Sequence, residues 1–356
     1  MQSGTTPGAR YRACLWQSQV SARPPYNDCA ASARATLSLV RRQHPTSGAP
    51  PVPIHGILSF DKPVGVTSRD AVDRVQTWFR GVHCGHAGTL DPLAQGVLLI
   101  ALGKATRLIE EYQELTKTYR ARLQLGLYST TDDAEGEKTP VPDVTPPALD
   151  RVLATLARFV GEIEQVPPAY SAVRAGRHRA YALARSGQMP ALTPRRVRIE
   201  AIECLNYCYP SLEIEVRCGK GTYIRSLARD LGQALGCGAY LDELTRTRIG
   251  PFVRDRAVRW DDSAERARAA LVPVAVGLPY PTIHVGEADL LRLSRGQAIS
   301  PTLNGGPSEA AGLSSQQGKV LVLPAGQTLE STRLVILARW DAGRRALQPD
   351  KVLELD

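Results

Sequence analysis

The chain has 356 residues, of which 43% are hydrophobic, which is enough for one large domain with a smaller one, or for two domains. Its longest apolar run, Val97–Leu102, has the length of a strand and falls well short of the about 20 residues of a membrane helix, so we predict no membrane span. The net charge of +9 favours a polyanionic partner but does not establish one, because many soluble proteins are mildly basic.

Residues 1–53 differ in composition from the rest of the chain. They contain six Arg, no Lys and a single acid, Asp28, together with many Ser, Ala and Pro. We interpret this segment as a disordered leader and expect that its removal leaves the activity intact. The composition also resembles that of an organelle transit peptide, and a start codon placed too far upstream explains it equally well.

The folded part of the chain is predicted to begin at about Gly56. The run GILSFDKPVG is typical of a strand that ends in a Pro/Gly turn. Ser68 is then predicted to cap a helix that extends from about Arg69 to Phe79, because apolar residues recur on one face of that segment.

The middle of the chain alternates strands with helices. The segment KTYRARLQLGLYST, from Lys117, alternates like a strand and leads into an acidic turn, TDDAEGE. Residues 148–160 are predicted to form a helix. The run SLEIEVRCGKGTYIRSLARDLGQAL, from Ser211, combines a strand, a glycine turn and a helix with one apolar face.

The segment Arg174–Arg198 contains seven Arg and no acid. Arg rather than Lys favours forked contacts with phosphate, although a solvated charged face is the ordinary alternative. The sequence pattern changes again near residue 270. Residues 273–281 are typical of a linker, and beyond it GKVLVLP and TRLVILARW are strand candidates that follow a Gly/Ser-rich loop. Residues 280–356 are therefore predicted to form a small β-rich domain.

The seven cysteines are odd in number and irregular in spacing, which argues against a disulfide framework and favours a reducing, cytoplasmic location. Cys204 and Cys208 lie in a strand-like region, and no CxxC pair or second ligand pair accompanies them. The run HCGH at 83–86 is an isolated cluster. We therefore predict no metal site.

A single carboxylate, Asp91, stands before Pro92 between a glycine-rich turn and a long apolar run. Asp before Pro is a common helix start, with Asp as the cap and Pro in the first turn, so the dipeptide alone favours a cap over a catalyst. The run GKGT at 219–222 lacks the upstream spacing of a nucleotide phosphate loop.

The combination of several segments overrides the interpretation of Asp91 as a helix cap. Taken in this order, five runs between about Gly56 and Phe252 resemble the TruB family, the tRNA pseudouridine synthase B enzymes. They are GILSFDKPVGVTS, HCGHAGTLDPLAQGVLLIALGKATRL, KTYRARLQLGLYSTTDDAEGE, QVPPAYSAVRAGRHRAYALARSG and CGKGTYIRSLARDLGQALGCGAYLDELTRTRIGPF. The run GHAGTLDPLAQGVL is highly specific for this family.

The resemblance implies an isomerase that converts uridine to pseudouridine at T-loop position 55 of tRNA, with no cofactor and no metal. Asp91 matches the family's catalytic carboxylate. It either attacks C1′ of the ribose or removes a sugar proton, and the sequence leaves this choice open. The target base must be flipped out of the folded T-loop, which costs a few kcal/mol.

The resemblance also implies a pocket around Asp91. Tyr119 matches the aromatic residue that stacks on the target base, and Tyr223 and Arg225 match the pair that lines the pocket, with Arg225 paired to Asp91. A half-buried strand Tyr and a surface helix Arg are the plain structural alternatives.

Two further residues match less specific family positions. His86 matches the His that meets the RNA where the base leaves its stack, and a structural turn His is its alternative. Leu244 aligns with an apolar pocket residue, for which core packing is a fair alternative.

Basic residues complete the implied RNA interface. Lys62 is expected to support loop architecture rather than catalysis, and Arg107 is expected to touch phosphate. Residues 170–197 resemble the family's RNA-gripping insertion, in which Arg177, Arg179 and Arg185 are candidate phosphate contacts. This segment departs from the family in the position of its turn glycine and in an Arg/His that replaces a Lys pair.

The resemblance implies an α+β pseudouridine synthase fold over residues 54–270, with a mixed, mainly antiparallel sheet crossed by a cleft, and a PUA-like RNA-binding domain over 280–356. The expected partner is the tRNA T-arm, bound by a monomer without a guide RNA, because guide-dependent relatives lack the insertion. Two alternatives stay open: a guide-RNA-dependent RNA pseudouridine synthase, and a catalytically silent tRNA-binding or folding protein.

Overall fold

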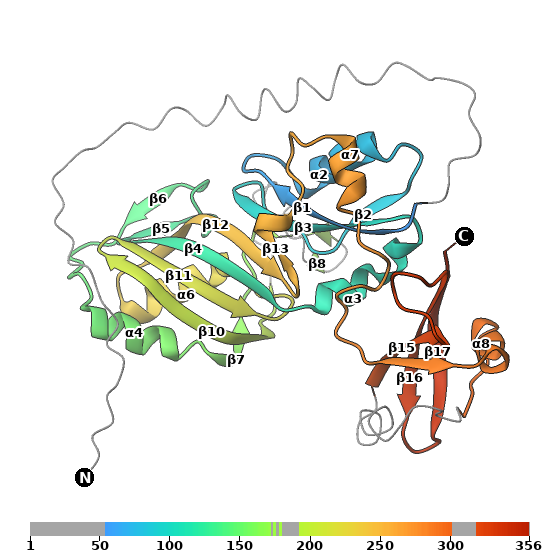
Figure 1. Cartoon of the computed structure of the whole chain (residues 1–356). Coiled ribbons are helices and arrows are strands. Elements are labelled where there is room, and N and C mark those ends of the chain that lie inside the picture. Colours follow the sequence, from blue (N-terminus) through green and yellow to red (C-terminus); the bar gives the residue numbers. More distant parts are fainter. Residues whose placement is uncertain (1–53, 172–173, 176–177, 180–191, 301–317, 356) are drawn as a thin grey trace, which may run out of the picture.

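The computed structural model describes residues 54–171, 174–175, 178–179, 192–300 and 318–355. The interpretation of residues 1–53 as a leader lies outside the described residues. Most strands belong to two sheets, one nine-stranded and one four-stranded (Figure 1). Among the described residues no helix is long and apolar enough to cross a membrane.

The nine-stranded sheet confirms the predicted mixed, mainly antiparallel arrangement. Neighbouring strands run antiparallel except β3 and β12, which run parallel. Across the sheet the strands are β1 (Gly56–Lys62), β3 (Ala94–Leu102), β12 (Ala239–Ile249), β4 (Lys117–Leu125), β11 (Ser211–Cys218), β10 (Arg195–Cys208) and β7 (Gly161–Gln165), with β2 (Cys84–His86) beside β3 and β13 (Phe252–Val253) beside β12.

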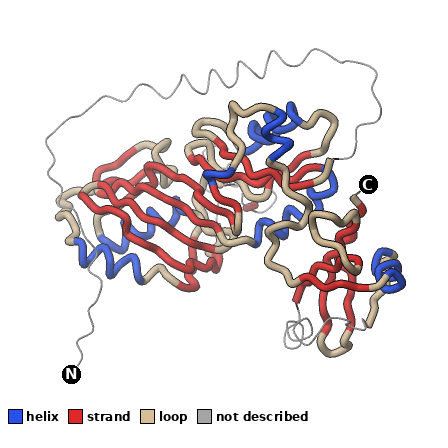
Figure 2. The backbone as a smooth tube through the Cα atoms, viewed as in Figure 1, coloured by secondary structure: helices blue, strands red, loops and turns tan. Residues whose placement is uncertain are grey.

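Helices pack on both ends of this sheet (Figures 1 and 2). At the β1–β3 end, α2 (Ser68–Trp78) and α7 (Ala264–Ala269) share an apolar core with the two strands. At the other end, α4 (Leu149–Ala157) and α6 (Ile224–Leu235) cover one sheet face, and α6 buries Leu227 and Leu231 completely. Because the cores are separate, the sheet has two halves, which meet where β3 runs beside β12.

The start of α2 differs from the prediction by one residue. Thr67, not Ser68, is the N-cap: its hydroxyl accepts a hydrogen bond from the Asp70 amide, and the Asp70 carboxylate accepts one from the Thr67 amide at 2.8 Å. The Ser68 hydroxyl donates to the Leu90 carbonyl at 3.0 Å and accepts from the Leu90 amide at 2.8 Å. Ser68 therefore holds the loop before Asp91 rather than the helix.

The other predicted elements of this domain are confirmed with small shifts. The strand from Lys117 is β4 and continues as β5 (Leu127–Ser129), which pairs with β6 (Lys138–Pro140) around the acidic turn. The helix predicted over 148–160 is α4, which ends at Ala157. The glycine turn after β11 leads directly into α6, as predicted.

The sheet face opposite α4 and α6 is hollowed and charged. Its hollow, of about 950 Å³, is lined by side chains from β4, β10, β11 and β12 and from the segment 253–255. Cross-strand ion pairs cover it, such as Arg120–Glu213 at 3.1 Å, while Arg248 and Asp255 lie exposed at its edge. None of the sequence-predicted site residues whose side chains the structure describes lines this hollow.

A small β-rich domain follows, as predicted. Its strands are β14 (Thr282–Val285), β15 (Gly318–Pro324), β16 (Leu334–Asp341) and β17 (Ala346–Glu354), with β14 parallel to β15 and the other pairs antiparallel. The helix α8 (Glu287–Ser294) packs against this sheet. One apolar core joins Val97 and Leu99 of the large sheet to Leu321, Leu337 and Leu353 of the small one.

A buried carboxylate fixes the joint between the two sheets. Glu111 lies on α3 (Ile109–Glu114), where its side chain is 2% exposed. It accepts hydrogen bonds from Lys319 at 2.7 Å, Lys351 at 3.0 Å and the Tyr280 hydroxyl at 2.6 Å. Burial by itself raises the pKa of Glu111, but these hydrogen bonds outweigh it and lower the pKa to about 2.

Replacing Glu111 with Gln is expected to destabilise the folded protein by about 3 kcal/mol at pH 7, because the half-buried Lys319 and Lys351 lose the nearer of their carboxylate partners. The folded-state pKa of Glu111, about 2, lies below its ordinary value of 4.5. The stabilisation is therefore complete above pH 4.5 and is lost as pH falls toward 2. Urea unfolding at pH 7 and at pH 3 measures both effects.

The matched control for this prediction is the neighbouring Glu110→Gln. The Glu110 side chain is 85% exposed and lies 3.6 Å from Lys351, so its loss is expected to change the unfolding free energy by less than about 1 kcal/mol. Equal losses in the two variants would show that burial of Glu111 contributes nothing.

Candidate active site

Asp91 lies on the loop between β2 and β3, at the junction of the two halves of the sheet. The strand β3 begins at Ala94, so Asp91 and Pro92 do not start a helix, and the interpretation of Asp91 as a helix cap is wrong. The loop is held by hydrogen bonds from the Gly65 amide to the Pro92 carbonyl at 2.7 Å and from the Ala94 amide to the Asp91 carbonyl at 3.0 Å. Together with the Ser68 contacts to Leu90, they fix the backbone on both sides of the carboxylate.

A buried arginine on the neighbouring strand β12 also holds this loop. Arg246, on β12, is 1% exposed, and its Nε donates to the Val97 carbonyl at 2.7 Å while Nη2 donates to the Gly88 carbonyl at 3.2 Å. Gly96 has φ +107°, and a Cβ there would lie 2.2 Å from the Arg246 carbonyl. Only glycine therefore lets β3 approach β12 closely enough to seat this arginine under the loop.

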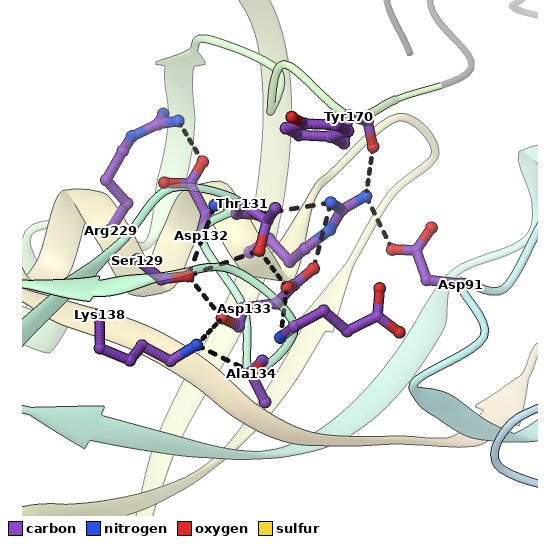
Figure 3. A network of polar contacts seen from close by, with 11 residues as sticks. Asp91, Ser129, Thr131, Asp132, Asp133, Ala134, Lys138, Tyr170 and Arg229 are labelled. Atoms are coloured by element: carbon purple, nitrogen blue, oxygen red, sulfur yellow. Dashed lines mark hydrogen bonds and ion pairs between the residues drawn. The ribbon is translucent and has the colours of Figure 1, made fainter. Parts of the chain in front are cut away.

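The guanidinium of Arg225 is the second group that holds Asp91 (Figure 3). Arg225 belongs to the first turn of α6, and its side chain is 5% exposed. Its Nη2 lies 2.9 Å from Asp91 Oδ2 and donates to the Tyr170 carbonyl at 2.9 Å, while Nη1 lies 3.3 Å from Asp133 Oδ2. The fork therefore spans two carboxylates.

Asp133 is itself fixed by the acidic turn (Figure 3). Its side chain is 3% exposed, and its Oδ1 accepts hydrogen bonds from the Glu135 amide at 3.0 Å and from the Thr131 hydroxyl. The Ser129 hydroxyl and Lys138 Nζ donate to the Asp133 carbonyl at 2.6 and 3.0 Å. A series of polar contacts thus connects the acidic turn, through Asp133 and Arg225, to Asp91. The Asp91 side chain remains 36% exposed and is open to a ligand.

Asp91 and Arg225 line one pocket, of about 550 Å³. The structure brings together five of the sequence-predicted residues there: Asp91, Tyr119, Tyr223, Arg225 and Leu244. Leu244 is 8% exposed and pairs in register with Ala94 of β3, so it contributes to both the core and the pocket wall.

Two tyrosines, Tyr119 and Tyr223, contribute to the pocket lining. Tyr119 lies on β4 directly opposite Arg246 in the β4–β12 register, and the guanidinium carbon lies 6.0 Å from its ring centroid. The Tyr223 backbone is held by Gln165, which accepts from its amide at 2.8 Å and donates to its carbonyl at 3.1 Å. Burial raises the pKa of both phenols, so they stay neutral near pH 7.

The structure does not bring His86 into this pocket lining. His86 ends β2, and its Nδ1 is buried without a hydrogen-bond partner in the described part of the chain. Burial, together with the charges of Arg246 and Arg69, lowers the pKa of the imidazole. A contact of His86 with RNA stays a prediction.

The candidate basic residues have different surroundings. Lys62 is fully buried, and its Nζ donates to the Pro63 carbonyl at 2.9 Å and to the Val66 carbonyl at 2.8 Å, as loop architecture requires. Arg107 is exposed and donates to the Val352 carbonyl of β17 at 2.6 Å, so it also joins the two sheets. Arg177 and Arg185 lie outside the described residues, and for Arg179 only the backbone of the short strand His178–Arg179 is described.

Sequence reasoning missed Arg246, Asp133 and Lys117. Lys117 begins β4, is 6% exposed and lines the pocket beside Tyr119. The sequence contained a signal for Arg246, because it follows Leu244 by two residues and therefore falls on the same inward face of a strand. The sequence contained no such signal for Asp133, because an acidic turn is ordinarily solvated. Among the described residues no group of three or more His, Cys, Asp or Glu side chains is placed to hold a metal ion.

Comparison with known proteins agrees with this geometry. Residues 76–224 match the model of the TruB family pseudouridylate synthase N-terminal domain, and residues 225–270 match that of the tRNA pseudouridylate synthase B C-terminal domain. A chain of a solved Cbf5–Nop10–Gar1 complex superimposes with a TM-score of 0.63 at 25% identity, covering 83% of this chain and 84% of that one. The fold is that of a pseudouridylate synthase.

Relatives define the family more closely. A tRNA pseudouridine synthase B of Caulobacter sp. (strain K31) is 39% identical over 314 residues, which cover 85% of this chain and 97% of that protein. The enzyme of the same name from Burkholderia mallei is 39% identical over 306 residues, or 84% and 97% of the two chains. The chain belongs to the TruB family.

Proposed function

We propose that the protein isomerises uridine to pseudouridine in tRNA, at position 55 of the T-loop, and that it acts without a guide RNA. The observation that carries this proposal is the Asp91 carboxylate, which buried Arg225 holds in the lining of a pocket that also contains Tyr119 and Tyr223. The relatives that share 39% identity bear the name of tRNA-acting enzymes, and the net charge of +9 suits an RNA substrate.

The reaction breaks the N1–C1′ bond, turns the base over and joins C5 to C1′. C5 loses its proton and N1 gains one, so that uridine and pseudouridine have the same atoms. Asp91 serves either as the nucleophile at C1′ or as the base that removes a sugar proton. Arg225 occupies one carboxylate oxygen at 2.9 Å, which fixes the direction of the other toward the ligand. Tyr119 then stacks on the flipped base, at a flipping cost of a few kcal/mol.

The remaining assignments concern RNA binding. The substrate region is the T-arm, held by the monomeric protein through the insertion around residues 170–197 and through the C-terminal domain over 280–356, which we assign to the PUA-like RNA-binding modules. The protein acts in the cytoplasm and uses neither metal nor cofactor. The shared core and the Glu111 joint support a fixed placement of the C-terminal sheet relative to the pocket.

The decisive experiment incubates the purified protein with an unmodified tRNA transcript and maps pseudouridine along it. Modification at position 55 alone, with no guide RNA present, is expected, and a transcript with cytidine at that position is the control. Activity that requires an added guide would favour the guide-dependent alternative. Binding without any isomerisation would favour a silent tRNA-binding protein.

A further inference from the structure

The pocket extends beyond the part that the reaction occupies. Besides the residues already described, its lining includes Lys117, Arg195 and the glycine loop Gly219–Thr222, which contains Lys220. This loop is the run that lacks the spacing of a nucleotide phosphate loop. Asp91 is the pocket's only reacting group, and the isomerisation assigns no task to this basic end.

Lys117 is the buried cation of this end. It is 6% exposed, and its Nζ donates to the Gln113 carbonyl, one turn earlier in the chain. Burial, together with the charges of Arg246 and Lys220, lowers the pKa of Lys117 from 10.5 to about 8, although Cys218 and Glu114 act in the opposite direction. Burial of a charged lysine without a counter-charge is unfavourable, so binding of an anion beside Lys117 is expected to be favourable.

The described residues supply no carboxylate for it. The bonds of Lys117 and of neighbouring Arg246 go to backbone carbonyls. The nearby acids are already engaged, Asp91 and Asp133 by Arg225, and Glu114 by Lys220. Lys117 and Arg246 therefore both line the pocket, and within the described part of the chain neither forms an ion pair with a carboxylate.

We propose that Lys117 binds a backbone phosphate of the RNA adjacent to the flipped uridine. This inference rests on the proposed function and extends it to a second subsite of the same pocket. Lys117 and Tyr119 lie two residues apart on β4, on one face and about 7 Å apart along the strand. A base stacked on Tyr119 thus places its flanking phosphates within reach of Lys117, while exposed Lys220 and Arg195 lie at the rim.

The first test compares Lys117→Met with Lys117→Arg. Binding of unmodified tRNA is measured at several salt concentrations, with a thermal melt to confirm that each variant is folded. The Met variant is expected to bind about tenfold more weakly and to lower the log–log salt slope by about 0.7–0.9, as one lost phosphate contact predicts. The Arg variant keeps the charge and is expected to keep most of both.

Arg248→Gln is the matched control, because it removes one positive charge from the exposed opposite face of the sheet. It is expected to leave affinity and salt slope nearly unchanged. An equal change in the control and in Lys117→Met would overturn the proposal, because the effect would then be one of net charge. An unchanged salt slope in a folded Met variant would overturn it as well.

The second test identifies the phosphate. In a synthetic T-arm hairpin, the phosphates around the target uridine are replaced one at a time by neutral methylphosphonates. Wild-type protein is expected to lose about tenfold in affinity at one of them, and Lys117→Met is expected to lose nothing further there.

The two proposals fail in different ways. If no single neutral phosphate weakens binding by the wild-type protein, the phosphate subsite is wrong even where the Met variant cannot be purified. Pseudouridine formation in the unsubstituted hairpin is measured in parallel. Its absence would contradict the proposed function, whereas its presence together with indifference to every methylphosphonate would contradict only the subsite.

Discussion

Replacing Asp91 with Asn is expected to stop pseudouridine formation while tRNA remains bound. The amide has the same size and its oxygen can still accept a hydrogen bond from Arg225, which donates to Asp91 at 2.9 Å. It lacks the charge and the basicity that either mechanism requires, so the rate at saturating tRNA is expected to fall by at least about 1,000-fold.

Binding should respond in the opposite direction. RNA is held chiefly through its phosphates, so removal of a negative charge from the pocket is expected to leave affinity unchanged or to raise it slightly. Single-turnover assays and a filter-binding titration on the same preparation separate the two effects. Asp255→Asn, which removes a carboxylate from the exposed opposite face, is the control and is expected to be fully active.

A result within about tenfold of wild type, equivalent to about 1.4 kcal/mol in the barrier, would remove Asp91 from the catalytic step. The pocket would then need another carboxylate. Asp133 is the nearest candidate by connectivity, yet its side chain is 3% exposed and fully engaged in the acidic turn. We assign the reaction to Asp91 because its side chain is 36% exposed and can reach a ligand, whereas that of Asp133 is buried.

The sequence predicted the parts of the site that lie in distinctive local runs. Asp91, Tyr119, Tyr223, Arg225 and Leu244 each stand in a motif that identifies the family, and the pocket contains all of them. The strand and helix periods also placed the main elements within a few residues, because each half of the sheet has an apolar face that only one register buries.

What the sequence could not supply are groups whose role depends on distant partners. Asp133 pairs with Arg225 across 92 residues, and Ser68 holds Leu90 across 22. Both are polar residues in places where local rules assign them to a solvated turn or to a helix cap. Local rules do not consider a partner that is distant in the sequence, so tertiary contacts decide the roles of Asp133 and Ser68.

The Asp133–Arg225–Asp91 chain leads to the second large expected effect. Replacing Arg225 with Lys is expected to lower the rate at saturating tRNA by about 100-fold, a loss typical of a catalytic group displaced by about 1 Å. A lysine retains the charge, but one ammonium cannot reproduce the planar fork that reaches Asp91 at 2.9 Å and Asp133 at 3.3 Å. Affinity for tRNA should change little, since the phosphate contacts remain.

Arg225→Met separates the structural part of this role from the positioning part. It leaves the buried Asp133 without a cation and is expected to lower the free energy of unfolding by about 3–5 kcal/mol, whereas the Lys variant should lose much less. Arg229→Lys, one turn along α6, is the matched control: Arg229 pairs with Asp132 at 2.8 Å and does not line the pocket. Wild-type turnover in a folded Arg225→Lys protein would mean that the loop contacts of Ser68 and Arg246 suffice to aim Asp91. In that case Arg225 would serve the stability of the acidic turn, and the Met variant would lose stability in urea while its remaining folded fraction kept full activity.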